Sequence, residues 1–174
     1  GALETGPIDE DEILSPRDAD GHGTHTATTA AGNRSSASIF GTLIGDVEGM
    51  APKARVAAYK ACWLRPGDTR ASCNTSDLAR AIDAAVADGV DVINFSIGGA
   101  STSFNGPDDV AFLFAADAGV FVATSAGNAG PNPQTIGTPS GVPWITAVGA
   151  AQDDQVFGIG VDIGRGIGVG AANP

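Results

Sequence analysis

Residues 75–99 read TSDLARAIDAAVADGVDVINFSIGG, and within them helical spacing gives way to a continuous apolar run. Over 75–89 the spacing predicts an amphipathic helix, with apolar residues at Leu78, Ala81, Ile82, Ala85 and Val86. One of the polar residues at 74–76 can cap its start, and a glycine can end it. Residues 90–99 are apolar without alternation and close with two glycines, which predicts a strand buried on both faces.

The same alternation of elements continues on both sides of this stretch. ARVAAYKA, residues 54–61, predicts a buried strand before the helix. PDDVAFLFAADAG, residues 107–119, predicts a second helix with proline and two acids in its first turn. Residues 120–131 predict another strand that runs into a glycine loop, and residues 142–150 predict a further strand. This order favours an α/β fold, a mostly parallel sheet flanked by helices, in which ligands bind at the carboxyl ends of the strands.

The composition is typical of a globular domain. Of the 174 residues, 43% are hydrophobic and 17% are charged, which is enough apolar sequence for a core. The net charge of −11 argues against nucleic acid as a partner, because nucleic-acid-binding proteins present a basic patch. No run is long and apolar enough to span a membrane, so no membrane partner is expected.

Acidic residues concentrate in 4–20, where seven acids accompany one arginine. We interpret residues 1–20 as an acidic, solvated N-terminal loop. A cation site is the alternative, although no D-x-D-x-D pattern supports it. No signal peptide is visible and the chain begins without Met, which favours a processed or truncated product.

Both histidines of the chain, His22 and His25, lie in SPRDADGHGTHTATTAAG, residues 15–32, at the start of a predicted short helix. A histidine at the positive end of a helix dipole is disfavoured in its protonated form, which suits a general base. The alternative is a pair of capping or packing histidines. A metal site is a weaker interpretation, because H-x-x-H stands without a third ligand.

Two glycine-rich segments lie at the carboxyl ends of predicted strands. The edge at Ser96–Gly99 has small side chains and can accept an extended peptide as an added strand, or it is a routine exit from the strand. Asn128 in SAGNAGP offers a neutral amide donor for an oxyanion, or it simply makes a turn. A phosphate-binding loop is excluded, since no G-x-x-x-x-G-K-[ST] occurs, and a nucleotide-binding domain is therefore disfavoured.

Taken together, residues 15–150 resemble the subtilisin-type serine proteases. The motifs that carry the resemblance are DGHGTHTATTAAG, GMAPKARVAAYKACW, DGVDVINFSIGG, ATSAGNAGP and GTPSGVPWITAVGA. Within this family, the chain resembles the plant-type, cucumisin-like branch in three features: SPRD, YKACW and the two cysteines. The resemblance implies a subtilisin-like three-layer α/β/α fold, here incomplete, and a secreted serine endopeptidase that hydrolyses polypeptides by a Ser-His-Asp mechanism.

The resemblance also implies roles for individual residues. His22 is the general base, His25 its structural neighbour, and Asn128 the oxyanion donor. The substrate, bound as an extended strand, lies along a wall formed by Ser96, Ile97, Gly98, Gly99, Ala126 and Gly127. Relatives often bind calcium, but no ligand set, metal or other cofactor is identified here. The resemblance further implies a disulfide between Cys62 and Cys73, with two free thiols as the alternative; a disulfide fits an oxidising, extracellular compartment.

Two parts of the triad pattern are absent from these residues. No D-[ST]-G precedes His22, and no G-T-S-x-[AS] follows Asn128. Neither Asp18 nor Asp20 has the context of the orienting acid, and Ser125 and Ser140 fall outside the nucleophile segment.

We therefore expect residues 21–150 to be a partial peptidase domain, inactive alone, whose partner is the remainder of its own catalytic domain. Residues 151–174, rich in glycine, are interpreted as the approach to an inserted domain. The alternative function is a non-catalytic peptide-binding or scaffolding domain derived from a subtilase.

Overall fold

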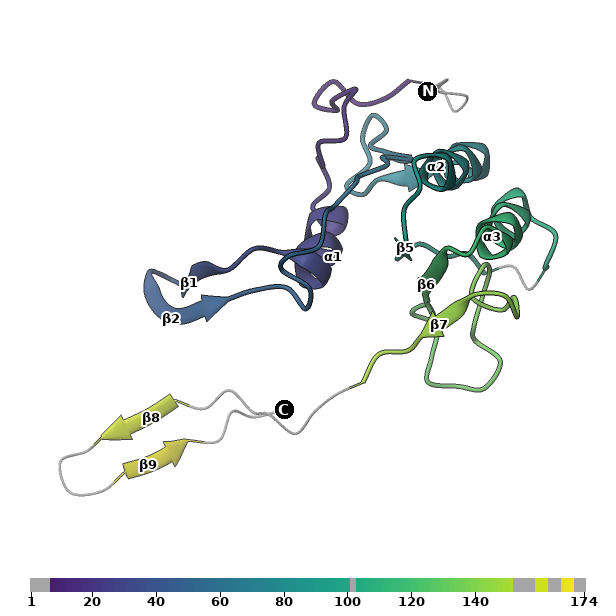
Figure 1. Ribbon diagram of the computed structural model, residues 1–174. Coiled ribbons are helices and arrows are strands. Elements are labelled where there is room, and N and C mark those ends of the chain that lie inside the picture. Colours follow the sequence, from purple (N-terminus) through teal and green to yellow (C-terminus); the bar gives the residue numbers. More distant parts are fainter. Residues whose placement is uncertain (1–6, 101–102, 152–158, 163–166, 171–174) are drawn as a thin grey trace.

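The structure is a computed structural model that describes residues 7–100, 103–151, 159–162 and 167–170 (Figure 1). Its centre is a parallel sheet of β5 (Val92–Phe95), β6 (Phe121–Ser125) and β7 (Thr146–Val148), in the order β5-β6-β7. The predicted α/β class with a parallel sheet is confirmed. The strands are shorter than the apolar runs that predicted them, because the segments on either side leave the ladder.

Helices α2 (Thr75–Ala87) and α3 (Pro107–Asp117) lie side by side against one face of this sheet (Figure 1). Both match the predicted helices closely. The glycines that follow them, Gly89 and Gly119, have φ values of 74° and 86°. These left-handed values favour glycine and turn the chain back toward the next strand.

The core lies between the two helices and the sheet. Phe112 of α3 has no exposed surface, and its ring meets that of Phe95 of β5 edge-to-face, with centroids 4.9 Å apart. The other buried members of this cluster are small or aliphatic: Ala61, Leu78, Ile82, Ala111, Ala115, Val120 and Val122.

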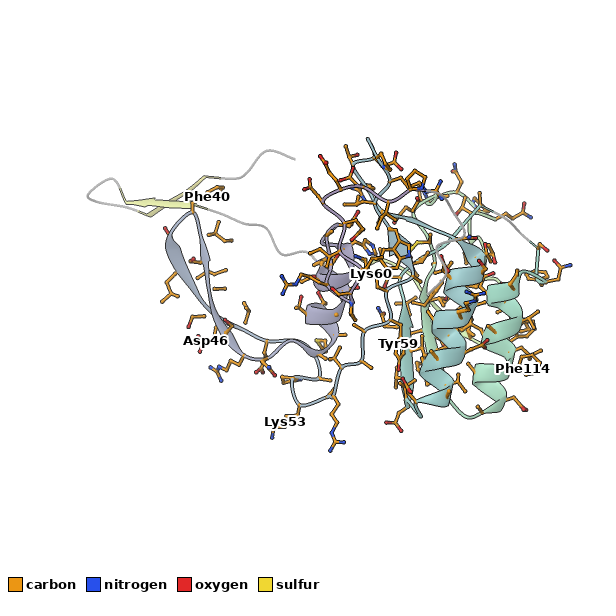
Figure 2. All side chains as sticks on the ribbon, turned by 90° about the horizontal axis from the view of Figure 1, so that it is seen from above. Phe40, Asp46, Lys53, Tyr59, Lys60 and Phe114 are labelled. Atoms are coloured by element: carbon orange, nitrogen blue, oxygen red, sulfur yellow. A yellow bond between two sulfur atoms is a disulfide. The ribbon has the colours of Figure 1, made fainter. Side chains whose placement is uncertain are left out.

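Helix α1 (His22–Ala31) begins at the first histidine and ends before Gly32, as the sequence predicts. The strands lie between α1 on one side and α2 and α3 on the other (Figures 1 and 2), which is the arrangement of a three-layer fold. No residue of α1 is buried, so the described core is confined to the side of α2 and α3.

The end of α1 is held by the chain that returns past it. The N–H of Gly49 donates to the carbonyl of Gly32 at 2.8 Å. A Cβ on Gly49 would lie 2.3 Å from the backbone nitrogen of Gly32, so only glycine permits this approach.

Three antiparallel strand pairs lie outside the parallel sheet in the described residues. A hairpin of β1 (Ser35–Ile39) and β2 (Thr42–Val47) projects from α1, with Phe40 at its tip (Figures 1 and 2). The short strands β3 (Cys62–Trp63) and β4 (Ser72–Cys73) pair beside the disulfide, and β8 (Ile159–Asp162) pairs with β9 (Ile167–Gly170) in the glycine-rich tail. The remainder of the tail lies outside the described residues, and no described helix is long or apolar enough to cross a bilayer.

The strand predicted at residues 54–61 is wrong. No described strand pairs with this segment, and Val56 is 60% exposed. The segment is held instead by side-chain contacts, among them a 2.7 Å hydrogen bond from the Tyr59 hydroxyl to Asp88 at the end of α2. An apolar run forms a strand only when a partner ladder is available, and β5 here pairs only with β6 among the described strands.

Substitution Phe112→Ala is expected to lower the free energy of unfolding by about 3–5 kcal/mol, because it opens a cavity in the core. Phe114→Ala on the same helix is the control, since this ring is 63% exposed and points outward (Figure 2). The control is expected to change stability by less than about 0.5 kcal/mol. Urea unfolding followed by circular dichroism measures both, and equal losses would contradict the assignment of the core.

Candidate functional site

The start of α1, which carries His22, is organised by the carboxylate of Asp18. One oxygen accepts the N–H and the hydroxyl of Thr24, both at 2.7 Å. The other accepts the N–H groups of Asp20 and Gly21 at 3.0 and 2.9 Å. Asp18 thus satisfies donors at the helix start that have no partner inside the helix.

These hydrogen bonds also change the acidity of Asp18. Burial by itself would raise the pKa of this carboxyl, but the bonds from Gly21, Thr24 and Asp20 outweigh it and lower the pKa to about 2. Asp18 is therefore a structural anion at neutral pH.

His22 is exposed at the first position of α1. Its backbone N–H donates to the Asp20 carboxylate at 3.2 Å, and the preceding Gly21 has φ of 94°, a conformation that favours glycine. Asp20, Gly21 and His22 line a small open hollow together with Thr69 and Arg70 of the loop between the two cysteines. No described residue hydrogen-bonds the His22 imidazole, which leaves the ring available to a ligand.

The acidic segment before α1 is not simply solvated, so that interpretation is wrong for Glu12. The Glu12 side chain is 1% exposed and forms an ion pair with Lys60, whose ammonium lies 4.9 Å from the centroid of the Trp63 ring. The other oxygen of Glu12 accepts the N–H of Leu64 at 2.8 Å. Burial opposes ionisation of Glu12, but the bonds from Lys60 and Leu64 lower its pKa.

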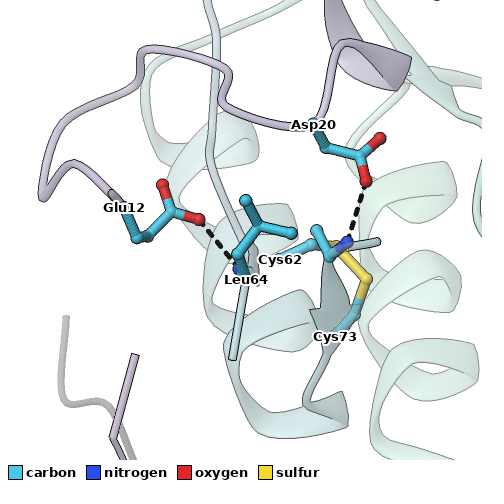
Figure 3. The surroundings of a disulfide bond; sticks show 6 residues. Glu12, Asp20, Cys62, Leu64 and Cys73 are labelled. Atoms are coloured by element: carbon cyan, nitrogen blue, oxygen red, sulfur yellow. Dashed lines mark hydrogen bonds between the residues drawn. A yellow bond between two sulfur atoms is a disulfide. The ribbon is translucent and has the colours of Figure 1, made fainter. Parts of the chain in front are cut away.

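The predicted disulfide between Cys62 and Cys73 is present, and the two residues face each other in the β3–β4 pair (Figure 3). Asp20 accepts the N–H of Ala71 at 2.8 Å, while Glu12 binds Leu64 near the other end of the loop (Figure 3). The acidic segment therefore fixes the disulfide loop beside the start of α1.

The second half of the candidate site lies at the carboxyl ends of β5 and β6. These strands are parallel neighbours with Phe95 opposite Thr124, so the segments that follow them, 96–99 and 126–128, start at the same edge of the sheet. Beyond β5, the Gly99 N–H donates to the Thr138 carbonyl at 2.9 Å. Among the described residues, the backbone groups of Ile97 and Gly98 have no backbone partner, so this edge is open to an added strand.

The loop after β6 presents Asn128. Ser125 accepts the Gly127 N–H at 3.0 Å, and Gly127 adopts φ of 91°, which reverses the chain. Asn128 is exposed, and no described residue hydrogen-bonds its side-chain amide. The amide is thus a free neutral donor at the edge of the sheet.

Ser140 does not lie in a position to act as a nucleophile. Its side chain is buried, its hydroxyl lies 2.9 Å from that of Thr124, and it donates to the carbonyl of Ser125. Ser140 therefore stabilises the loop that carries Asn128. Ser125 stabilises the same loop, because its carbonyl binds Ser140 and its hydroxyl binds Gly127.

Sequence reasoning missed Asp109, which supports the open strand edge after β5 through Thr138. It is 1% exposed, and its carboxylate accepts the Thr138 hydroxyl at 2.9 Å and the Gly106 N–H at 3.0 Å. Its carbonyl accepts the Trp144 indole N–H at 3.2 Å. Asp109 thereby holds Thr138 where it binds Gly99. In the sequence it is one of two acids in a first helical turn, which gives no signal of this contact.

The structure brings the predicted residues into two groups. Ser96, Ile97, Gly98 and Gly99 share an edge with Ala126, Gly127 and Asn128, whereas His22 lies with Asp18, Asp20, Thr69 and Arg70. In the part of the chain that is described, no hydrogen bond joins the two groups. Over the same residues, no cluster of three or more His, Cys, Asp or Glu side chains is placed to hold a metal ion.

The sequence is similar to those of known plant proteases. Subtilisin-like protease SBT1.3 of Arabidopsis thaliana is 48% identical over 163 residues, which are 92% of this chain and 20% of that protein. Subtilisin-like protease SBT1.6 of the same plant is 48% identical over 160 residues, 89% of this chain and 20% of its own length. These relatives agree with the plant-type resemblance of the motifs.

Solved structures give the same result for the fold. The S41 Psychrophilic Protease is 34% identical with a TM-score of 0.59, covering 86% of this chain and 43% of that chain. Sphericase is 28% identical with a TM-score of 0.58, covering 88% and 45%. The fold is thus that of subtilisin-like serine proteases. A sequence profile of the subtilase family matches residues 4–159, and the chain belongs to this family. It spans about 20% of the length of the curated relatives named above.

Asp18→Ala is expected to lower the free energy of unfolding by about 1–2 kcal/mol at pH 7, as loss of a helix cap does. The pKa of Asp18 falls from 3.8 to about 2 on folding, so its contribution is complete above pH 3.8 and is lost as the pH falls toward 2. Unfolding measured from pH 7 to pH 2 should therefore show the difference between wild type and variant shrinking. Asp11→Ala, an exposed acid of the same segment, is the control, and a difference independent of pH would contradict the role of the Asp18 charge.

Proposed function

We propose that this chain supplies the general base, the oxyanion donor and part of the substrate groove of a secreted serine endopeptidase. His22 accepts the proton of a serine nucleophile, and Asn128 donates to the oxyanion of the tetrahedral intermediate. The polypeptide substrate lies as an extended strand on Ser96–Gly99, with Ala126 and Gly127 on the other wall.

One observation carries this proposal: the β5–β6 ladder places an open strand edge and a free Asn128 amide at the same end of the sheet. An added strand needs unpaired backbone groups, and an oxyanion needs a donor that is not already satisfied. Both are present here, and the exposed imidazole of His22 belongs to the motif that provides the base in this family.

The orienting acid and the serine nucleophile are proposed to come from the rest of a longer protein. Apolar side chains of the sheet support this, since Val92, Phe121 and Val148 are 58%, 55% and 56% exposed. Large apolar side chains on three neighbouring strands favour cover by further chain. Residues 1–174 alone are accordingly expected to lack peptidase activity. The Cys62–Cys73 disulfide supports an extracellular location, because disulfides persist in oxidising compartments.

The test is labelling with a fluorophosphonate probe, read as intact mass. The full-length protein that carries this chain is expected to gain one probe, and residues 1–174, shown by circular dichroism to be folded, none. A labelled fragment would mean that His22 activates a serine within these residues. An unlabelled full-length protein that still binds peptides would instead support the non-catalytic peptide-binding alternative.

His22→Ala in the full-length protein is expected to lower kcat by about 10⁴-fold or more, because no other group takes the proton of the nucleophile. His25→Ala is the matched control, as it is also an exposed histidine of α1. It is expected to retain activity within about tenfold. Peptide hydrolysis measures both, and equal losses would show that α1 matters only for folding.

Asn128→Ala is expected to lower kcat by roughly 10²–10³-fold with little change in KM, because the amide binds charge that develops only in the transition state. Asn132→Ala serves as the control, as it lies in the same exposed loop beyond the glycine turn. A rise in KM with unchanged kcat would assign Asn128 to substrate binding instead.

A further inference from the structure

The hollow beside His22 contains two residues, Thr69 and Arg70, that have no role in the proposed proton transfer. It is an open depression of about 280 Å³, lined by Asp20, Gly21, His22, Thr69 and Arg70. Three of these residues come from the start of α1 and two from the disulfide loop, more than forty positions further along the chain. A cationic side chain and a hydroxyl are thus placed next to the proposed general base.

Three bonds fix the position of the disulfide loop. The Cys62–Cys73 bond closes it, Glu12 accepts the N–H of Leu64 near one end, and Asp20 accepts the N–H of Ala71 near the other (Figure 3). Ala71 directly follows Arg70, so the backbone of Arg70 is fixed relative to the residues that precede His22.

Of the two charged side chains that line the hollow, Asp20 already has hydrogen-bond partners and Arg70 has none among the described residues. The two carboxylate oxygens of Asp20 accept the backbone N–H groups of His22 and Ala71, at 3.2 and 2.8 Å. Arg70 is exposed, and no hydrogen bond or ion pair joins it to a described residue. Arg34 and Lys60 are in ion pairs, whereas several other cations of the described chain, Arg65 of the same loop among them, are in none. Arg70 differs from these in its position, because it is the one cationic residue that lines the hollow.

We infer that Arg70 and Thr69 form a subsite that selects an acidic side chain of the polypeptide substrate, close to the bond that is cleaved. The inference rests on the proposed function, because it requires His22 to lie beside the reacting serine. A general base lies within hydrogen-bond reach of the group it deprotonates, so a hollow that shares His22 as a wall is adjacent to the scissile bond.

The chemistry of Arg70 decides the substrate class. A guanidinium presents a planar fork of N–H donors that matches a carboxylate, and the Thr69 hydroxyl can donate a further hydrogen bond. Asp or Glu in the substrate therefore fits the hollow better than Asn or Gln, which have the same shape without the charge.

The test uses the full-length protein and peptides that differ at one position, with Asp or Glu exchanged for Asn or Gln at each position flanking the cleaved bond. At one position, kcat/KM is expected to favour the acid by about two- to fivefold, the size of an exposed ion pair. Arg70→Gln is expected to abolish this preference, and Arg70→Glu to replace it with a preference for Lys. Raising the salt concentration should reduce the wild-type preference, since salt screens exposed charges.

Arg65→Gln is the matched control. Arg65 has the same charge and lies in the same disulfide loop, but it does not line the hollow. An acidic preference that survives Arg70→Gln, or that Arg65→Gln removes equally, would overturn the inference, as would uniform cleavage of all the peptides. In each of these cases the protein still cleaves peptides, so the proposed function stands. A full-length protein that neither cleaves a peptide nor reacts with the fluorophosphonate overturns the proposed function, and this inference with it.

Discussion

The parallel pairing of β5 with β6 is the constraint on which both the core and the candidate site depend. With Phe95 opposite Thr124, the ring of Phe95 packs against Phe112 below the sheet, and the two glycine segments leave the sheet at one edge. A slip by one residue would turn Phe95 to the opposite face of the sheet and displace the open edge from the loop of Asn128. The hydrophobic effect that builds this core therefore also sets the geometry of the site.

A second constraint is the use of carboxylates as partners for the backbone. The acidic composition suggests a solvated surface, yet several acids accept N–H groups that have no partner in a helix or strand. Asp18 organises the start of α1, Glu12 and Asp20 fix the disulfide loop, and Asp109 caps α3 while holding Thr138. Such bonds are charge-assisted, which makes them stronger than bonds between neutral groups. Part of the net charge of this subtilase chain is consequently structural.

Elements with clear local signals were predictable from the sequence, whereas the errors arose where such signals are missing or where a distant partner is needed. α2 and α3 were predictable because their apolar spacing, first turns and terminal glycines are local signals. The β1–β2 hairpin was missed, because its turn at Phe40 and Gly41 carries left-handed φ values of 49° and 80° without the Asn-Gly or Asp-Gly that usually signals such a turn. Residues 54–61 were predicted as a strand from their apolar composition, although composition cannot supply the neighbouring strand that a ladder requires.

The sequence by itself determined the class of the fold, the family motifs and the residues able to do chemistry, since each depends on local spacing or on residue type. Only the tertiary structure decided which of these residues meet. The bond between Asp20 and Ala71 joins positions 51 residues apart, and that between Asp109 and Thr138 joins positions 29 apart. Contacts of this kind form only after the chain has packed around its core. The placement of Arg70 and His22 in one hollow, and of Asp109 against Thr138, is therefore a property of the folded chain.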